Sequence, residues 1–328
     1  MDYINYVKQS PMMGQIGLGG GATSLGRYGS SGGEWSGGDR GLFMGGLIIP
    51  TSPYHSNRID YLAITSTGNA TDFGDLYTQR SKTRAAGSNG TRGIQGGGQP
   101  FTDTIDYVTI ASTGNASDFG DLDQACSEIA CCSNSIRGVF CGGSTPGAIN
   151  TMQYVTIDTT GDTTDFGDLD NGSRSRMAEG CNGERGVLGG GAPDLHSIWY
   201  FTMGTLGNTS EFGDLTGSSS RGWGIVGGSN DTRAIFMGGT PNGSDGREVI
   251  DYITIATTGN ATDFGDWSIG SGQAAGTANS TRCLAGGANA AGDKSNLIDY
   301  VTIDTPGNAS DFGDLTQARA DPGATSGD

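Results

Sequence analysis

Several ingredients of an ordinary two-layer domain are scarce in this 328-residue chain. Apolar residues make up 34% of it, which is too few for one thick hydrophobic core. No stretch approaches the roughly 18 consecutive apolar residues of a membrane-spanning helix. The most apolar run, residues 41–50, contains three glycines. We therefore expect neither a single large core nor a transmembrane segment.

The N-terminal residues MDYINYVKQSP lack the apolar core of a secretory signal, so export through a signal peptide is not expected. No two cysteines have CxxC spacing, and we expect free thiols in a protein that folds in a cytosol. A Cys131–Cys132 or Cys126–Cys141 bridge remains an alternative. The six cysteines are Cys126, Cys131, Cys132, Cys141, Cys181 and Cys283.

Basic residues are also scarce. Lys and Arg number 18 against 35 Asp and Glu, which gives a net charge of −17. Such a surface repels nucleic acid and anionic membranes, so neither is an expected partner.

Glycine, in contrast, is abundant, with 61 residues placed at regular intervals. The marker Asp-Phe-Gly-Asp, once with Glu first, occurs six times at spacings of 46, 47, 46, 52 and 48 residues. A tyrosine precedes each marker by 11 residues. Between them lie a strand rich in Val, Ile and Thr and a Thr-Gly-Asn turn, so each unit predicts a β-hairpin. The tyrosines are Tyr61, Tyr107, Tyr154, Tyr200, Tyr252 and Tyr300.

A second pair of strands precedes each hairpin. A small-residue strand and a polar turn lead to an Arg, which begins a short apolar strand that ends in a Gly pair, as in residues 92–98. Each repeat therefore predicts four short strands, and no segment has a helical period. In this order, with a Gly pair and then a Tyr strand, the repeat resembles the kelch repeat. Kelch blades usually place Trp in the fourth strand, where this chain has Phe.

The resemblance covers about residues 38–328 and implies a six-bladed kelch-like β-propeller of the all-β class, to which we assign residues 33–328. Residues 1–32 carry no Tyr–turn–Phe-Gly-Asp unit, so we expect an extended N-terminal arm there and not a blade. A closed ring also protects strand edges that an open array would expose. The C-terminal segment near Ala320–Ser326 aligns with the small-residue strands, so we expect it to close the first blade. Residues Gly33–Gly38 are the competing candidate.

Loop length varies on one face only. The loops between the second and third strands contain 14, 8, 10, 8, 12 and 12 residues, whereas the turn between the third and fourth strands is constant. Binding residues usually lie in loops on a rigid scaffold, so we expect any ligand to contact this face. The expected ligand-binding residues are Tyr54, His55, Phe101, Asp103, Asp194, His196, Asp245, Arg247 and Lys294.

The residues indicate no catalytic chemistry. The only two histidines, His55 and His196, fall in opposite blades of a six-bladed ring, so no metal site or cofactor is expected. Calcium binding by the recurring aspartates is the alternative to a structural role, in which they cap turns and pair with the recurring Arg. We expect a protein that is not an enzyme.

The opening segment YVKQSPMMGQIGLGGGATSL resembles the start of structural proteins of tailed, notably marine, phages. The resemblance implies a virion protein, on tail or capsid, that folds in the host cytoplasm and contacts other virion proteins, a host-surface glycan or receptor, or further copies of itself. The alternatives are an extracellular glycan-binding or sugar-active kelch propeller and an intracellular protein-binding adaptor. We expect the arm to dock on another virion subunit and to anchor the propeller through its residues Tyr6, Met12, Met13, Ile16 and Leu18. A flexible tail is the alternative.

Overall fold

The computed structural model describes residues 33–35, 37–48, 54–170, 172–193, 196–217, 221, 224–240, 247–268, 272–290 and 293–327. The expected arm over residues 1–32, with its anchoring residues, lies outside these ranges. The described residues contain no helix, and hence none of the length and apolarity that a bilayer crossing requires.

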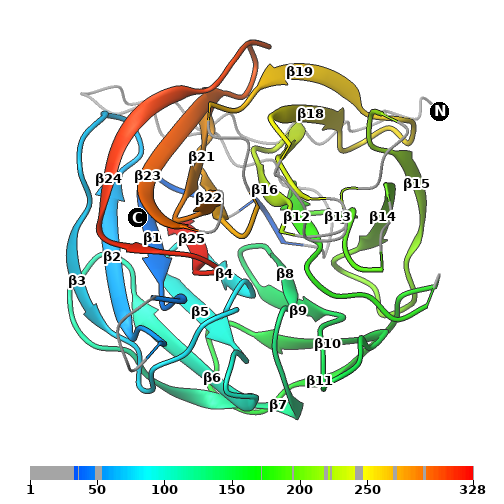
Figure 1. Ribbon diagram of the computed structural model, residues 1–328. Coiled ribbons are helices and arrows are strands. Elements are labelled where there is room, and N and C mark those ends of the chain that lie inside the picture. The colour runs from blue at the N-terminus through cyan, green and yellow to red at the C-terminus, as the bar shows by residue number, and fades with distance from the viewer. Residues whose placement is uncertain are drawn as a thin grey trace, which may run out of the picture. The chain divides into compact units, whose positions relative to one another are not determined.

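Six antiparallel sheets, each with four principal strands, stand around one axis and form a β-propeller (Figure 1). Blade 1 contains β25 (Gly323–Gly327), β1 (Arg40–Met44), β2 (Arg58–Ala63) and β3 (Thr71–Asp75). Blade 2 contains β4 (Ala86–Ser88), β5 (Arg92–Gly96), β6 (Thr102–Thr109) and β7 (Ser117–Cys126). Blade 3 contains β8 (Ala130–Ser133), β9 (Arg137–Cys141), β10 (Thr151–Thr156) and β11 (Thr164–Asp168).

The remaining three blades repeat the same strand order. Blade 4 contains β12 (Ala178–Cys181), β13 (Arg185–Gly189), β14 (Ser197–Thr202) and β15 (Ser210–Asp214). Blade 5 contains β16 (Val226–Ser229), β17 (Arg233–Met237), β18 (Val249–Thr254) and β19 (Thr262–Asp266). Blade 6 contains β20 (Ala275–Ala278), β21 (Arg282–Gly286), β23 (Asp293–Thr302) and β24 (Ser310–Arg319), with the short β22 (Asn289–Ala290) beside β23.

The ring is closed by the C-terminal strand. In blade 1, β25 pairs antiparallel with β1, in a register that sets Leu42 opposite Thr325. Figure 1 shows the C-terminal strand in red beside the blue β1. The predicted closure is therefore confirmed, and the competing candidate, Gly33–Gly38, is wrong because its described residues form no strand.

Six apolar clusters fill the spaces between neighbouring blades. Phe73 of blade 1, for example, packs with Val108 and Ile110 of blade 2. In every blade the Phe of the fourth strand meets the Tyr of the third edge-on, with ring centroids 5.8 to 6.1 Å apart. The Phe of the fourth strand thus packs both on the Tyr of its own blade and on apolar residues of the next blade.

The recurring Gly and Asn join each blade to the next. The Gly of Asp-Phe-Gly-Asp lies against the backbone of the Thr-Gly-Asn turn of the next blade, and a Cβ on Gly265 would lie 2.5 Å from the Gly307 carbonyl oxygen. In all six interfaces a side-chain oxygen of the turn accepts a hydrogen bond of 3.0 to 3.1 Å from the last Asp N–H of the marker. The acceptors are Asn69, Asn115, Asp162, Asn208, Asn260 and Asn308.

The recurring Arg also joins neighbouring blades, but not through the aspartates. Each guanidinium lies 4.2 to 4.7 Å from the centroid of its blade's Tyr ring. Its Nη1 donates a hydrogen bond of 2.8 to 3.1 Å to a backbone carbonyl of the next blade. The predicted Arg–Asp pairing is therefore wrong, because the aromatic ring and the carbonyl already take up the guanidinium. The six are Arg40, Arg92, Arg137, Arg185, Arg233 and Arg282.

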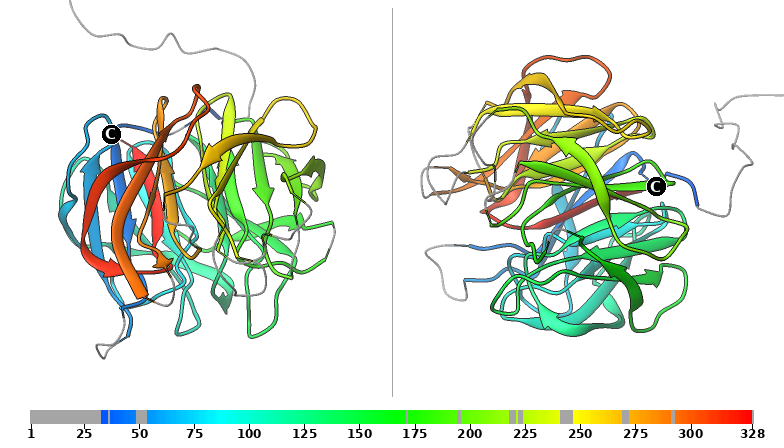
Figure 2. Two further views of the ribbon diagram at one scale, coloured as in Figure 1. Left: turned by 45° about the horizontal axis from the view of Figure 1, so that its top comes forward. Right: turned by 90° about the vertical axis from the view of Figure 1, so that its right-hand side faces the viewer.

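The strands run between two faces, as the side views show (Figure 2). The turns joining first to second and third to fourth strands lie together, since Ile110 N–H donates to the Thr91 carbonyl and the other blades repeat this bond. We call this the constant face. The second-to-third loops lie beside the connections between blades, as in the Ser81–Gln99 bridge, and form the variable face.

Candidate functional site

Six residues surround the axis on the variable face, and we call their ring the axial mouth. Each ends a connection between blades in the left-handed region, with φ between 50° and 71°. Backbone hydrogen bonds link neighbours: Glu128 N–H donates to the Lys82 carbonyl at 3.1 Å, and Arg176 N–H to the Glu128 carbonyl at 2.8 Å. The six residues are Lys82, Glu128, Arg176, Gly224, Gln273 and Asp321.

Blade 2 departs from the six-fold pattern at this mouth. Two residues, Thr83 and Arg84, separate Lys82 from Ala85, which immediately precedes β4, where the other blades have one residue at the equivalent place. The extra residue carries Arg84 across the axis, and its Nη2 donates to the Ile225 carbonyl of blade 5, the opposite blade. Arg84 is only 5% exposed, so its side chain is buried at this end of the ring.

The mouth holds a network of opposite charges. Glu128 Oε1 lies 2.8 Å from Lys82 Nζ and 2.5 Å from Arg176 Nη2. Burial alone would raise the pKa of Glu128, but the hydrogen bonds from these two cations hold it below its usual value. Asp321 lies 3.5 Å from Arg84 Nη1, and burial raises its pKa despite the neighbouring cations.

Lys294, on β23, belongs to the same network, since Asp321 acts on it electrostatically. Burial lowers the pKa of Lys294, while Asp321 and Asp293 oppose the shift. The cations around Asp321 come from blades 2, 4 and 6, so only the closed ring brings them together.

Below the mouth, the channel contains a cavity of about 80 Å³ bounded by the inner strands. Trp35 lines its constant-face end, and the Glu179 carboxylate enters it from β12. Glycines at Gly227 and Gly276 let the neighbouring inner strands approach closely, since a Cβ at either position would meet the backbone of the strand beside it. Burial raises the pKa of Glu179 to about 8, with Arg84 acting in the opposite direction.

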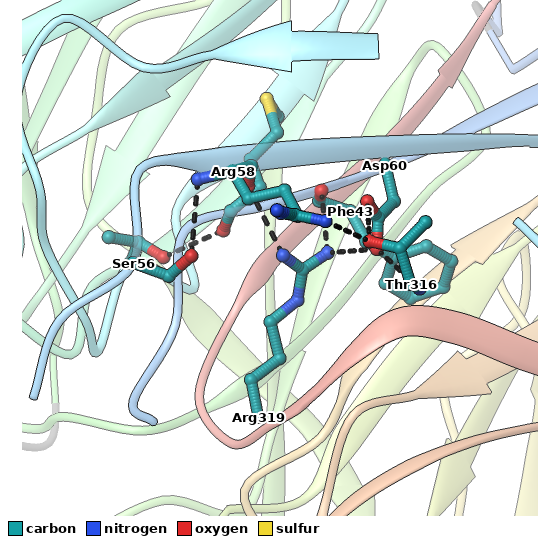
Figure 3. A network of polar contacts seen from close by, with 8 residues as sticks. Phe43, Ser56, Arg58, Asp60, Thr316 and Arg319 are labelled. Atoms are coloured by element: carbon teal, nitrogen blue, oxygen red, sulfur yellow. Dashed lines mark hydrogen bonds and ion pairs between the residues drawn. The ribbon is translucent and has the colours of Figure 1, made fainter. Parts of the chain in front are cut away.

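Buried Arg–Asp pairs support the mouth from beneath. Arg319 Nη2 lies 2.9 Å from Asp60 Oδ2, and it also donates to the Phe43 carbonyl (Figure 3). Arg80–Asp106 and Arg221–Asp251 are equivalent pairs in blades 2 and 5. Each Arg follows the Asp-Phe-Gly-Asp marker on the way to the next blade, Arg319 as the last residue of β24, and each Asp lies on a third strand. The pairs therefore fix the connections that present the mouth.

In the other three blades, the residue at the position of this aspartate makes different contacts. Arg174 of blade 4 lies 5.0 Å from the centroid of Trp199, which stands at the aspartate position. In blade 6, Asp299 accepts hydrogen bonds from the Trp267 indole at 2.8 Å and from Ser268. In blade 3, Gln153 takes the aspartate position and accepts a hydrogen bond from Asp123 N–H.

The structure spreads the expected ligand-binding residues around the variable face. Tyr54 and Phe101 are exposed, at 51% and 41%. Asp103 and His196 are also exposed, and His196 Nε2 lies 3.5 Å from Asp214 Oδ1.

The other expected residues are partly buried or not described. Arg247 is partly buried, while Asp194 and Asp245 lie outside the described residues. Only Lys294 and His55 connect to the axial mouth, His55 through an electrostatic interaction with Lys82. The expected residues therefore form a rim of separate groups and not one cluster.

His55 Nδ1 lies 2.9 Å from Ser81 Oγ, a distance that a catalytic base and its serine nucleophile would also have. Ser81 is 1% exposed, so its hydroxyl is closed to a substrate. Burial lowers the pKa of His55, and Lys82 lowers it further. The described residues contain no group of three His, Cys, Asp or Glu that could hold a metal ion.

Sequence reasoning missed the centre of the site, namely Lys82, Arg84, Glu128, Arg176 and Asp321. A signal was present, because Lys82, Glu128 and Arg176 each follow a serine at the same repeat position. Aligning the repeats backwards from the Gly pair would also have revealed the extra residue in blade 2. The charges differ between repeats, so composition alone could not show that they meet.

The fold and its closure define the class of protein: a six-bladed β-propeller whose inter-blade contacts repeat around the ring and whose loops diverge on one face. Comparison with protein-family models and with curated proteins finds no match to the chain.

Proposed function

We propose that the chain is a non-enzymatic structural protein of a tailed-phage particle, displayed on tail or capsid, that attaches to the host surface through its variable face. One observation carries this proposal. The contacts between blades repeat in all six blades, whereas the loops that differ in length lie on the variable face. The exposed Tyr54 and Phe101 also lie on that face. A rigid scaffold with one divergent face suits recognition.

The kelch resemblance supports a binding role over a purely architectural one. We propose the kelch type because the inner strands are built of small residues and each second strand ends in glycines with positive φ, such as Gly45 and Gly97. Phe replaces the usual Trp of the fourth strand and packs at the same interface between blades.

The N-terminal segment supports attachment through the face opposite to recognition. Glu34 exchanges two hydrogen bonds of 2.8 Å with Ser135, a residue of a first-to-second turn on the constant face. Trp35 lines the channel from that side. Glu34 and Trp35 therefore lie on the constant face. We propose that the residues before them bind other virion proteins while the variable face stays free.

Deletion of residues 2–30 tests this assignment. The truncated protein should fold with an unchanged melting temperature but be missing from purified particles, which quantitative mass spectrometry would measure. Normal incorporation would contradict the anchoring role.

Binding to host cells provides the second test. Purified wild-type propeller should adsorb to susceptible cells and compete with whole particles, and a triple Ala variant of Tyr54, Phe101 and His196 should adsorb less. Absence of adsorption by the wild-type propeller would contradict the attachment role.

A further inference from the structure

Most cations of this acidic chain have structural partners. Of its 15 arginines and three lysines, six arginines stack on the blade tyrosines. Four more are buried at the positions described for the Arg–Asp pairs. These four are Arg80, Arg174, Arg221 and Arg319.

The cations of the axial mouth are a separate group. Lys82, Arg84, Arg176 and Lys294 surround Asp321, and both described lysines are among them. At most three carboxylates, Glu128, Asp321 and Asp293, oppose these four cations, which leaves at least one positive charge in excess. Glu179, with a pKa of about 8, is largely protonated at pH 7 and adds little negative charge.

Two of these cations retain unused donors. Arg84 is 5% exposed, yet its Nε has no hydrogen-bond partner. The Lys294 ammonium is only partly buried and has no hydrogen bond or ion pair with a described side chain or carbonyl, although burial lowers its pKa. Buried donors without acceptors carry a free-energy cost, which an incoming acceptor would remove.

We infer that the axial mouth binds an anionic group, a carboxylate or phosphate, on a polysaccharide of the host surface. This inference rests on the proposed function and names the chemistry of its ligand. Charge-assisted hydrogen bonds from Lys and Arg favour these oxygens. The partly buried position of Lys294 and Lys82 would strengthen the attraction, since neighbouring protein excludes much of the screening solvent.

A charge-matched pair of variants tests the inference. The double variant Lys82→Gln/Lys294→Gln removes two positive charges at the mouth. Gln is compatible with the left-handed backbone at Lys82, since Gln273 occupies the equivalent position in blade 6. The control Thr67→Glu/Thr113→Glu adds two negative charges to exposed turns of the constant face. Both proteins therefore have the same net charge.

Binding to polygalacturonate, to a glycerol-phosphate polymer and to neutral dextran would be measured by biolayer interferometry at two salt concentrations. Wild type and control should bind at least one anionic polymer and not dextran, with weaker binding at high salt. The mouth variant should bind that polymer about tenfold more weakly. Which polymer binds distinguishes carboxylate from phosphate.

Equal loss in the mouth variant and the control would overturn the inference, because the effect would then follow net charge. Absence of binding to both anionic polymers would also overturn it. The single variant Lys294→Gln, which breaks no hydrogen bond, keeps the test valid if the double variant misfolds. Cell adsorption separates the two hypotheses: undiminished adsorption of the mouth variant contradicts the ligand chemistry alone, whereas absent adsorption of wild type contradicts the attachment role.

Discussion

Arg319 and Asp60 form an ion pair of 2.9 Å in the interior, with neither side chain exposed, although 259 positions separate them in the sequence. Asp60 also accepts hydrogen bonds from the Thr316 N–H and hydroxyl, so the end of β24 is tied to blade 1 (Figure 3). The pair lies immediately before β25, the strand that closes the ring. When β25 closes the ring, the buried Asp60 carboxylate is therefore brought together with its cation.

Replacement of Arg319 by Met should destabilise the propeller strongly. The substitution leaves the Asp60 carboxylate buried without its cation, a change that typically costs about 3–5 kcal/mol. Denaturant unfolding followed by circular dichroism would measure the loss.

The double variant Arg319→Met/Asp60→Leu is the matched control. Because both charges are removed together, it should be more stable than Arg319→Met alone. If the single variant retained wild-type stability, the pair would not secure the closure.

Replacement of Gly265 by Ala should destabilise the interface between blades 5 and 6 by about 2–4 kcal/mol. The new Cβ would lie 2.5 Å from the Gly307 carbonyl oxygen, at a φ of +149° that side chains rarely adopt. Gly307→Ala is the control, since its Cβ would meet no atom within 4 Å. Thermal melts of the two variants should differ widely, and similar melting temperatures would show that the close approach is not essential.

Replacement of Glu179 by Gln should change the pH dependence of stability. Burial raises the pKa of this carboxyl to about 8, so the folded chain retains a proton that the unfolded chain loses above about 4.5. The wild-type stabilisation is thus present below pH 4.5 and is lost as the pH rises through 8. The variant should melt at nearly the wild-type temperature at pH 4.5 and several degrees higher at pH 9. Parallel profiles for the two proteins would contradict the raised pKa.

The six thiols should not react in the folded protein. All six cysteines are free and buried, and burial raises the pKa of Cys126, Cys181 and Cys283 to about 12. An aromatic disulfide reagent should therefore modify no thiol in native buffer and six in denaturant. Rapid native labelling would show that the inner strands open readily.

The sequence predicted the blades well because each blade is a local unit. The Tyr strand, the Thr-Gly-Asn turn and the Phe strand lie within about 15 residues, so their spacing determines a hairpin. The closure by residues 323–327 was also predictable, since the last segment aligned with the first strands of other repeats. The free state of the cysteines followed from their spacing and is confirmed.

The contacts between blades were harder to predict. The recurring Arg was expected to pair with Asp, but Arg40 instead stacks on Tyr61 and donates to Ile110 of the next blade. A repeat that is constant in every blade does not reveal which neighbour it contacts. The axial mouth was missed for a related reason, since the inserted residue at Arg84 and the charges around Asp321 meet only when the ring is closed.

The pairing of β25 with β1 also has a consequence for synthesis on the ribosome. The strand at residues 40–44 emerges early, but its inner partner, residues 323–327, is translated after nearly 280 further residues. Until then the nascent chain exposes an unpaired edge of its first sheet and one side of its last. A chain truncated before residue 323 would therefore leave the edge of β1 unpaired and open to association with other chains.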